Sequence, residues 1–169
     1  EALIQMAQLA SQVPGVLFSL WRNEREEQYL YLSPGARSIF NVNEERGPEA
    51  TRQIRAAIHP DDLITYDTEF ELAERSQRPC RVEFRVLNPD TSTRWLLATA
   101  AAEPAPQGGN IWHGAAIDIT QQKNAEAELR KVASELRHSQ QVALSIMEDA
   151  TEARDRAEGI SRELEQATR

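Results

Sequence analysis

Residues 81–119 have the sequence RVEFRVLNPDTSTRWLLATAAAEPAPQGGNIWHGAAIDI, and this stretch sets the architecture of the domain. Its first six residues alternate between charged and apolar side chains, as in a strand with one buried face. Turn-forming groups at 88–90 and 104–109 interrupt the remainder. The stretch therefore predicts three consecutive antiparallel strands, at residues 81–87, 94–102 and 111–119.

The preceding residues predict a hairpin followed by helices. Apolar segments at 16–21 and 29–32 flank a charged turn, which is typical of two antiparallel strands. The sequence His59-Pro60-Asp61-Asp62 then caps a longer helix that runs to about residue 75. Short helical segments are predicted at 36–40 and 49–58. Two strands, helices and three more strands describe an α+β domain with a five-stranded antiparallel sheet and short helices on one face.

Two helical segments are expected outside this domain. Residues 1–13 place apolar side chains at helical spacing before Pro14-Gly15 and predict a short amphipathic helix. Residues 121–169 contain no proline and predict one long helix. We expect three parts: an N-terminal amphipathic helix at 1–13, a domain at 14–120 and a coiled-coil helix at 121–169.

The long helix carries an uninterrupted heptad repeat. A spacing of 3.5 residues holds an apolar stripe against a partner helix, so the pattern predicts a parallel coiled coil, with a surface helix of a bundle as the alternative. Its middle contains small residues such as Ser139 and Ala143, which bury little area and predict weak pairing there. The larger residues of this coiled-coil seam are Leu129, Val132, Leu136, Ile146, Ile160 and Leu164.

Composition limits the classes of function. The net charge of −8 provides no basic surface for nucleic acid, and no apolar run is long enough to span a membrane. A single cysteine, Cys80, excludes an internal disulfide and favours a reducing, cytoplasmic location. The chain does not begin with Met and carries no signal peptide, so we expect a segment of a longer protein.

Three motifs resemble those of bacterial PAS domains. They are Ile58-His59-Pro60-Asp61-Asp62-Leu63, the strand Arg94-Trp95-Leu96, and Gly114-Ala115-Ala116-Ile117-Asp118-Ile119-Thr120 entering a helix. The resemblance covers roughly residues 13–123. It implies a PAS fold, homodimerisation and an output domain in the same chain of the full protein, most often a histidine kinase and less often a cyclic-dinucleotide enzyme.

The strand-to-helix transition is the predicted signal junction. Asp118 and Thr120 lie where their side-chain oxygens can accept hydrogen bonds from the first turn of the helix. Such caps can also simply end a strand. In the family that this chain resembles, the signal leaves the domain at this point.

No catalytic chemistry is predicted. The chain has no glycine-rich phosphate loop, nucleophile motif or metal-ligand spacing among its three histidines. His138 occupies a helix, as phosphoacceptor histidines of sensor kinases do, but it lacks their acidic residue, arginine and proline. We expect no catalytic or metal site. An enzyme fragment phosphorylated on His138 is the least favoured alternative.

The interior is the predicted ligand region. Flavin-binding relatives carry an Asn-Cys-Arg motif on a helix, whereas Cys80 follows Pro79 at the head of a strand; haem would require a histidine within 63–75. Strand parity makes His113 the one weak ligand candidate. We expect a filled core or a small pocket, neither haem nor flavin, and leave a small-molecule ligand open. The candidate lining residues are Phe18, Phe40, Ile58, Phe70, Phe84, Trp95, Leu97 and Ala115.

The sequence therefore predicts a sensory and dimerisation module that passes a conformational signal through a parallel coiled coil to an output domain. A constitutive dimerisation scaffold without ligand is the alternative. The amphipathic helix at 1–13 is a second candidate dimer contact.

Overall fold

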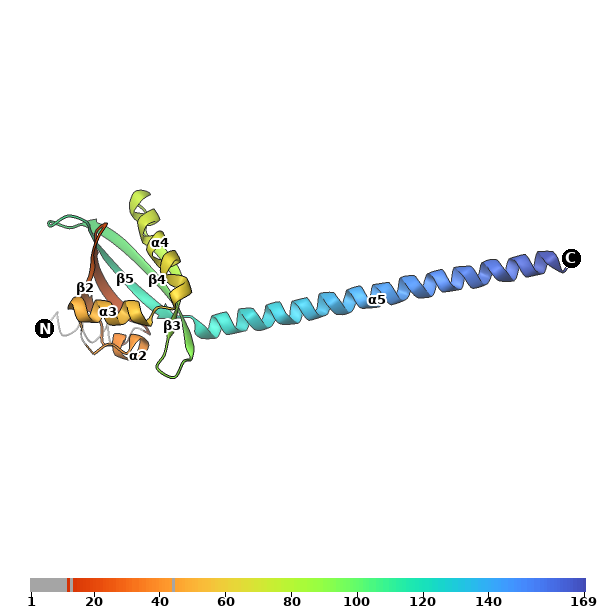
Figure 1. Cartoon of the computed structure of the whole chain (residues 1–169), viewed down its shortest axis with the longest axis horizontal. Coiled ribbons are helices and arrows are strands. Elements are labelled where there is room, and N and C mark those ends of the chain that lie inside the picture. The colour runs from red at the N-terminus through yellow and green to blue at the C-terminus, as the bar shows by residue number, and fades with distance from the viewer. Residues whose placement is uncertain (1–11, 13, 44) are drawn as a thin grey trace. The chain divides into compact units, whose positions relative to one another are not determined.

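A computed structural model describes residues 12, 14–43 and 45–169 (Figure 1). The predicted amphipathic helix at 1–13 lies outside the described residues, apart from Gln12. The strands are β1 (Val16–Arg22), β2 (Glu27–Leu32), β3 (Cys80–Leu87), β4 (Thr93–Pro104) and β5 (Asn110–Asp118). The helices are α2 (Ala36–Phe40), α3 (Gly47–Ala57), the 3₁₀ turn η1 (Pro60–Asp62), α4 (Leu63–Arg75) and α5 (Thr120–Ala167).

The five strands form one antiparallel sheet in the order β2-β1-β5-β4-β3. The first and last strands, β1 and β5, therefore lie side by side in the middle, and α2, α3 and α4 cover one face (Figure 1). This confirms the predicted five-stranded α+β fold and its long C-terminal helix.

The core lies between the helices and the covered face of the sheet. Val82, Phe84 and Val86 of β3 are buried, as their alternation predicts. On α4, Tyr66, Phe70 and Ala73 are buried, and Leu63 packs against the core. These side chains form one hydrophobic cluster with the inner residues of β1 and β5.

The inner faces of β4 and β5 differ from the sequence-based expectation. Leu96, Ala98 and Ala100 of β4 face the core, not Trp95 and Leu97. On β5 the buried residues are Trp112 and Ala116. Ala115 and His113 belong to the opposite face, so their expected inward orientation was wrong.

Register explains this reversal of parity. Phe84 is the cross-strand partner of Leu96, and Ala98 is the partner of Ala116. Residues directly opposite in an antiparallel pair share a face, so the inward orientation of Phe84 fixes the orientation of both neighbouring strands. Both faces of β4 carry apolar residues, and hydropathy alone did not separate them.

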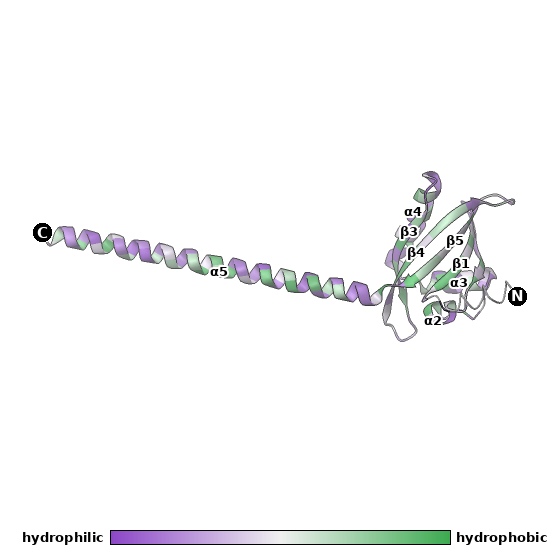
Figure 2. Cartoon of the chain, turned by 180° about the vertical axis from the view of Figure 1, so that it is seen from behind, coloured by the Kyte–Doolittle hydropathy of each residue, from purple (hydrophilic) through white to green (hydrophobic). Residues whose placement is uncertain are grey.

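Helix α5 is continuous over 48 residues and includes Gly159. Hydrophobic and hydrophilic residues alternate along it (Figure 2). The chain divides into two compact units, Glu1–Lys123 and Asn124–Arg169, so the first turn of α5 belongs to the domain. Within the described part of the chain, no helix combines the length and the apolar character that a membrane span requires.

Candidate functional site

The first turn of α5 is hydrogen-bonded to strand β4. The N–H of Ile119 donates to the carbonyl oxygen of Trp95 over 2.9 Å, and the N–H of Trp95 donates to the Thr120 hydroxyl, also over 2.9 Å. The Thr120 hydroxyl in turn donates to the Asp118 carboxylate over 2.6 Å, and the Thr120 N–H donates to the same oxygen over 2.9 Å. Thr120 thus bonds to β4 and to the last residue of β5, and this junction joins the sheet to the helix.

A second set of contacts surrounds Trp95 on the outer face of the sheet. The Lys123 ammonium lies 5.0 Å from the centre of the Trp95 ring, and the Arg85 guanidinium lies 5.5 Å from it. Both distances suit cation–π attraction. Lys123 also forms an ion pair with Glu83 of β3. One turn into α5, the helix is therefore bound to both β3 and β4.

Arg85 extends these contacts to the turn before α4. Its Nε and Nη2 donate to the two Asp62 carboxylate oxygens over 2.9 and 2.6 Å, and its backbone N–H donates to Asp62 over 2.8 Å. These bonds to Arg85 hold the pKa of Asp62 below its usual range despite partial burial. A continuous chain of contacts, which we name the relay, runs from Asp62 through Arg85 and Trp95 to Lys123.

The His-Pro-Asp-Asp turn is held to the sheet by its backbone. The N–H of His59 donates to the carbonyl of Arg85 over 2.8 Å, and the imidazole Nδ1 accepts from the Asp61 N–H over 3.2 Å. His59 is the N-cap residue of η1. Its predicted role as a turn and cap residue is confirmed.

A four-membered charge cluster includes Asp67, near the middle of α4. Arg22 and Arg55 each pair with both Glu27 and Asp67, at 2.6–3.1 Å. Burial would raise the pKa of Asp67, but the hydrogen bonds from Arg55 and Arg22 lower it overall. The cluster joins β1, β2, α3 and α4, and it adjoins the interior, since Arg22 also lies 5.3 Å from the centre of the Phe70 ring.

Comparison with known proteins identifies the fold family. The family described as PAS fold matches residues 29–116. The chain belongs to the PAS family. A crystal structure of a sensory box histidine kinase/response regulator from Burkholderia thailandensis E264 is similar to this PAS chain, with a TM-score of 0.60 and 24% identity, and covers 82% of this chain and 99% of that one.

Two other proteins are similar to this chain, over different shares of their own length. An RNA-binding light-oxygen-voltage receptor has a TM-score of 0.59 and 13% identity over 80% of this chain and 38% of that one. An uncharacterised protein of Sinorhizobium fredii, y4lL, is 27% identical over 115 residues. These residues are 67% of this chain but only 14% of the length of that protein.

The interior of this PAS domain is filled by aromatic rings. Tyr66 lies 5.1 Å from Phe70 and 5.2 Å from Phe84 between ring centres, and Phe70 lies 5.2 Å from Trp112. The Tyr29 and Tyr66 hydroxyls are 3.2 Å apart and buried, and burial raises the pKa of both. A planar cofactor would have to displace these rings.

The predicted lining residues therefore separate into two groups. Five belong to the buried cluster: Phe18, Phe40, Ile58, Phe70 and Phe84. Trp95, Leu97 and Ala115 belong to the outer face, where they cannot line an interior pocket. That part of the expectation was wrong, and a ligand contact for the first five stays a prediction.

Cys80 and the weak ligand candidate His113 both lie away from the centre of the interior. Cys80 is buried at the start of β3 opposite Ala100, and burial raises its pKa to about 11, so its thiol is protonated and unreactive at neutral pH. His113 is exposed, with Nδ1 2.9 Å from the Ser19 hydroxyl and Nε2 3.0 Å from Glu103. Neither residue fits the chemistry of a flavin adduct or an interior haem.

Proposed function

We propose that this chain is the sensory PAS module of a signal-transduction protein, and that it passes a conformational state through paired α5 helices to an output domain. The hydrogen bond between Trp95 and Thr120 is the observation that carries the proposal. It makes the first turn of α5 a continuation of the bonding of the sheet, so a shift of β4 changes the position of the helix start.

The relay connects the start of α5 with the start of α4. Asp62 lies at the beginning of α4, and Arg85, Trp95 and Lys123 connect it with α5. A displacement of α4 therefore reaches the helix through two routes, the backbone of β4 and the charged side chains on its outer face. This arrangement suits a domain whose helices respond to a signal.

Pairing of α5 is supported by its exposed apolar residues. The six large seam residues from Leu129 to Leu164 are all exposed on the single chain. In proteins most helical stability comes from packing of an apolar face, and burial of a heptad seam against a second copy stabilises this 48-residue helix. The proposed parts are the PAS domain at 14–120 and a parallel coiled coil at 121–169.

A histidine kinase is the proposed output. The similar Burkholderia thailandensis structure comes from a sensory box histidine kinase/response regulator, and we carry only that output class to this chain. A cyclic-dinucleotide enzyme is the alternative parent. We place the protein in the cytoplasm, because its one cysteine is free and buried and no disulfide is possible.

Site-specific disulfide crosslinking tests the parallel pair. In a parallel coiled coil a seam residue lies next to its own copy, so Leu136→Cys is expected to give a crosslinked dimer under mild oxidation. Leu144→Cys is the matched control, because Leu144 has the same side chain and lies outside the seam. The native Cys80 is replaced by Ser in both variants.

Coupling is tested by adding Thr120→Val to the crosslinking chain. We expect the rate of Leu136→Cys crosslinking to change when the junction loses its bond to Trp95. Equal crosslinking at 136 and 144 would contradict parallel pairing. An unchanged rate with Thr120→Val would favour a constitutive scaffold over a signal-transmitting module.

A further inference from the structure

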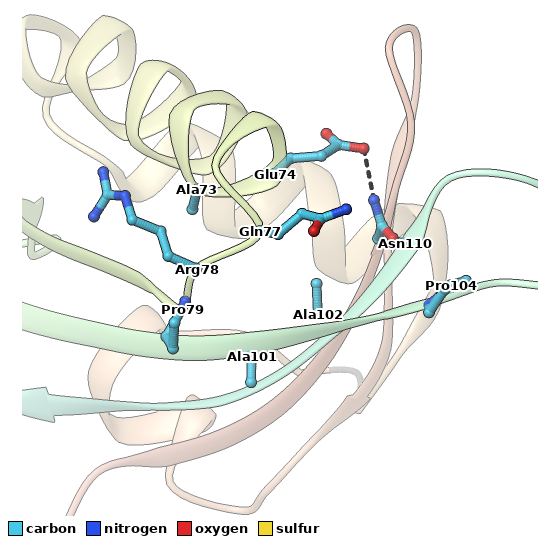
Figure 3. A pocket seen from close by; sticks show the side chains of 9 residues that line it. All are labelled: Ala73, Glu74, Gln77, Arg78, Pro79, Ala101, Ala102, Pro104 and Asn110. Atoms are coloured by element: carbon cyan, nitrogen blue, oxygen red, sulfur yellow. Dashed lines mark hydrogen bonds between the residues drawn. The ribbon is translucent and has the colours of Figure 1, made fainter.

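A cleft of about 460 Å³ opens between the end of α4 and the far end of β4 (Figure 3). Glu74, Gln77 and Arg78 form its helix side, and Ala101, Ala102 and Asn110 lie on the sheet side. It is separate from the junction, which lies at the opposite end of β4. Its volume falls in the range of small-molecule sites, about 300–1,000 Å³.

An unpaired strand edge borders this cleft. The pairing of β3 with β4 ends at Cys80 and Ala100, whereas β4 continues to Pro104. Within the described sheet, the stretch of β4 after Ala100 has a neighbour on the β5 side only. Ala101 and Ala102 carry only methyl groups there, so extended backbone from a ligand can approach the strand closely.

Opposite charges lie at the two ends of the cleft. Figure 3 shows the Glu74 carboxylate directed toward Asn110, and Arg78 at the other end beside Pro79, with the Gln77 amide between them. Asn110 donates to Glu74 over 2.6 Å. The Arg78 side chain is 48% exposed and pairs loosely with Glu69 at 3.6 Å, so its guanidinium can still bind a second anion.

A buried tryptophan lies next to the sheet side of the cleft. Trp112 is 1% exposed, and among the described residues its indole N–H has no acceptor. Trp112 is the cross-strand partner of Ala102, and it lies two residues from Asn110 on the same strand. Trp112 does not itself line the cleft, but its cross-strand partner Ala102 does, so a ligand bound along β4 changes the surroundings of the indole.

We infer that this cleft binds a short peptide with free termini. Its ammonium group pairs with Glu74, its carboxylate pairs with Arg78, and its backbone lies along β4 beside Ala101 and Ala102. Glu74 and Arg78 lie at opposite ends of the cleft with Gln77 between them, and this arrangement favours a di- or tripeptide over a single α-amino acid, whose charged groups are adjacent. The inference supplies a ligand class for the proposed sensor and rests on that function.

The test uses ¹⁵N-labelled chain 1–169 titrated with trialanine. Peptide is added up to about 10 mM, above the roughly 1 mM dissociation constant of a weak ligand. We expect the Trp112 indole resonance, assigned with Trp112→Phe, to shift on binding. The indole of Trp95, at the junction end of β4, is the internal reference.

Matched ligands and variants separate the contribution of the charges to binding from that of burial alone. N-acetyl-trialanine amide, which lacks both charges, is expected to bind about tenfold more weakly. Arg78→Gln and Glu74→Gln are expected to weaken trialanine binding about tenfold, whereas Arg75→Gln, outside the cleft, leaves it unchanged.

Three results would overturn the inference: no Trp112 shift, equal binding of the blocked peptide, or equal binding by Arg78→Gln and Arg75→Gln. None of these measurements depends on α5 pairing or on an output domain. A failure here is therefore distinguishable from a failure of the crosslinking experiment, which tests the proposed function itself.

Discussion

The backbone N–H of Trp95 donates to the hydroxyl of Thr120 across 2.9 Å, so a strand amide is satisfied by the first residue of a helix. Strand amides ordinarily bond to a neighbouring strand. Here β5 ends at Asp118, and the Thr120 hydroxyl accepts the bond that a strand carbonyl would otherwise accept. The start of α5 thereby becomes part of the sheet.

Thr120→Val is expected to destabilise the domain. Valine keeps the shape of threonine but leaves the Trp95 N–H without its acceptor, which costs about 1–3 kcal/mol in the free energy of unfolding. Urea unfolding of the chain measures this change. Thr168→Val is the control, because Thr168 bonds only to exposed carbonyls at the end of the same helix. Equal unfolding midpoints for the two variants would contradict a structural role for the junction.

Leu136→Glu is expected to weaken self-association of the chain at least about tenfold, since a charge on the seam must be buried on pairing. Leu136 and Leu144 are both 59% exposed in the single chain, and only Leu136 lies on the seam. Leu144→Glu therefore introduces the same charge without the same burial. Sedimentation equilibrium over a range of concentrations compares them, and an unchanged mass for Leu136→Glu would exclude the proposed pairing.

The fold was predictable because its strands and turns carry strong local signals. Val82, Phe84 and Val86 alternate with charged residues, and their burial follows directly. Residues 94–102 contain apolar side chains at nearly every position, so the largest ones were assigned to the interior. The structure buries Leu96, Ala98 and Ala100 there instead, and places Trp95 beside Lys123 and Arg85 on the outer face.

Register was the missing information. With Phe84 inward, a hairpin loop at 88–92 pairs Leu87 with Thr93 and sets Leu96 inward. The sequence marks this turn through Asn88-Pro89-Asp90 but not its length. The charged contacts of Asp62 and Lys123 were missed for another reason: they join residues more than 20 positions apart, and no local pattern identifies such partners.

Asp62→Asn is expected to reduce the dependence of stability on acid pH. Because the pKa of Asp62 is lowered in the folded state, the unfolded chain binds more protons near its ordinary value of about 4. The stabilisation by Asp62 is therefore present above about pH 4 and is lost as the pH falls through the lowered folded value. Asparagine lacks this contribution at every pH.

Urea unfolding at a series of pH values checks the Asp62 prediction. We expect wild type to be more stable than Asp62→Asn by about 1–3 kcal/mol at pH 7, with the difference shrinking below pH 4. Asp61→Asn is the neighbouring control, because Asp61 is 76% exposed and lies 3.9 Å from Arg85. A difference between wild type and Asp62→Asn that is constant with pH would show that the carboxylate charge is not its cause.

Gly114 permits close approach of β5 to β4, upstream of the junction. A Cβ at this position would lie 2.2 Å from the Thr99 carbonyl oxygen and 2.7 Å from the Ala100 Cβ, so Gly114→Ala forces the two strands apart. We expect a loss of about 2–4 kcal/mol in unfolding free energy.

The control for this prediction is Gly159→Ala, which meets no atom within 4 Å and is expected to stabilise α5 by up to about 1 kcal/mol. Chemical denaturation followed by tryptophan fluorescence and by helical circular dichroism separates the domain from the helix. If Gly114→Ala were as stable as wild type, the spacing of β4 and β5 would not depend on glycine, and the sheet would be more adaptable next to the junction than its close contacts indicate.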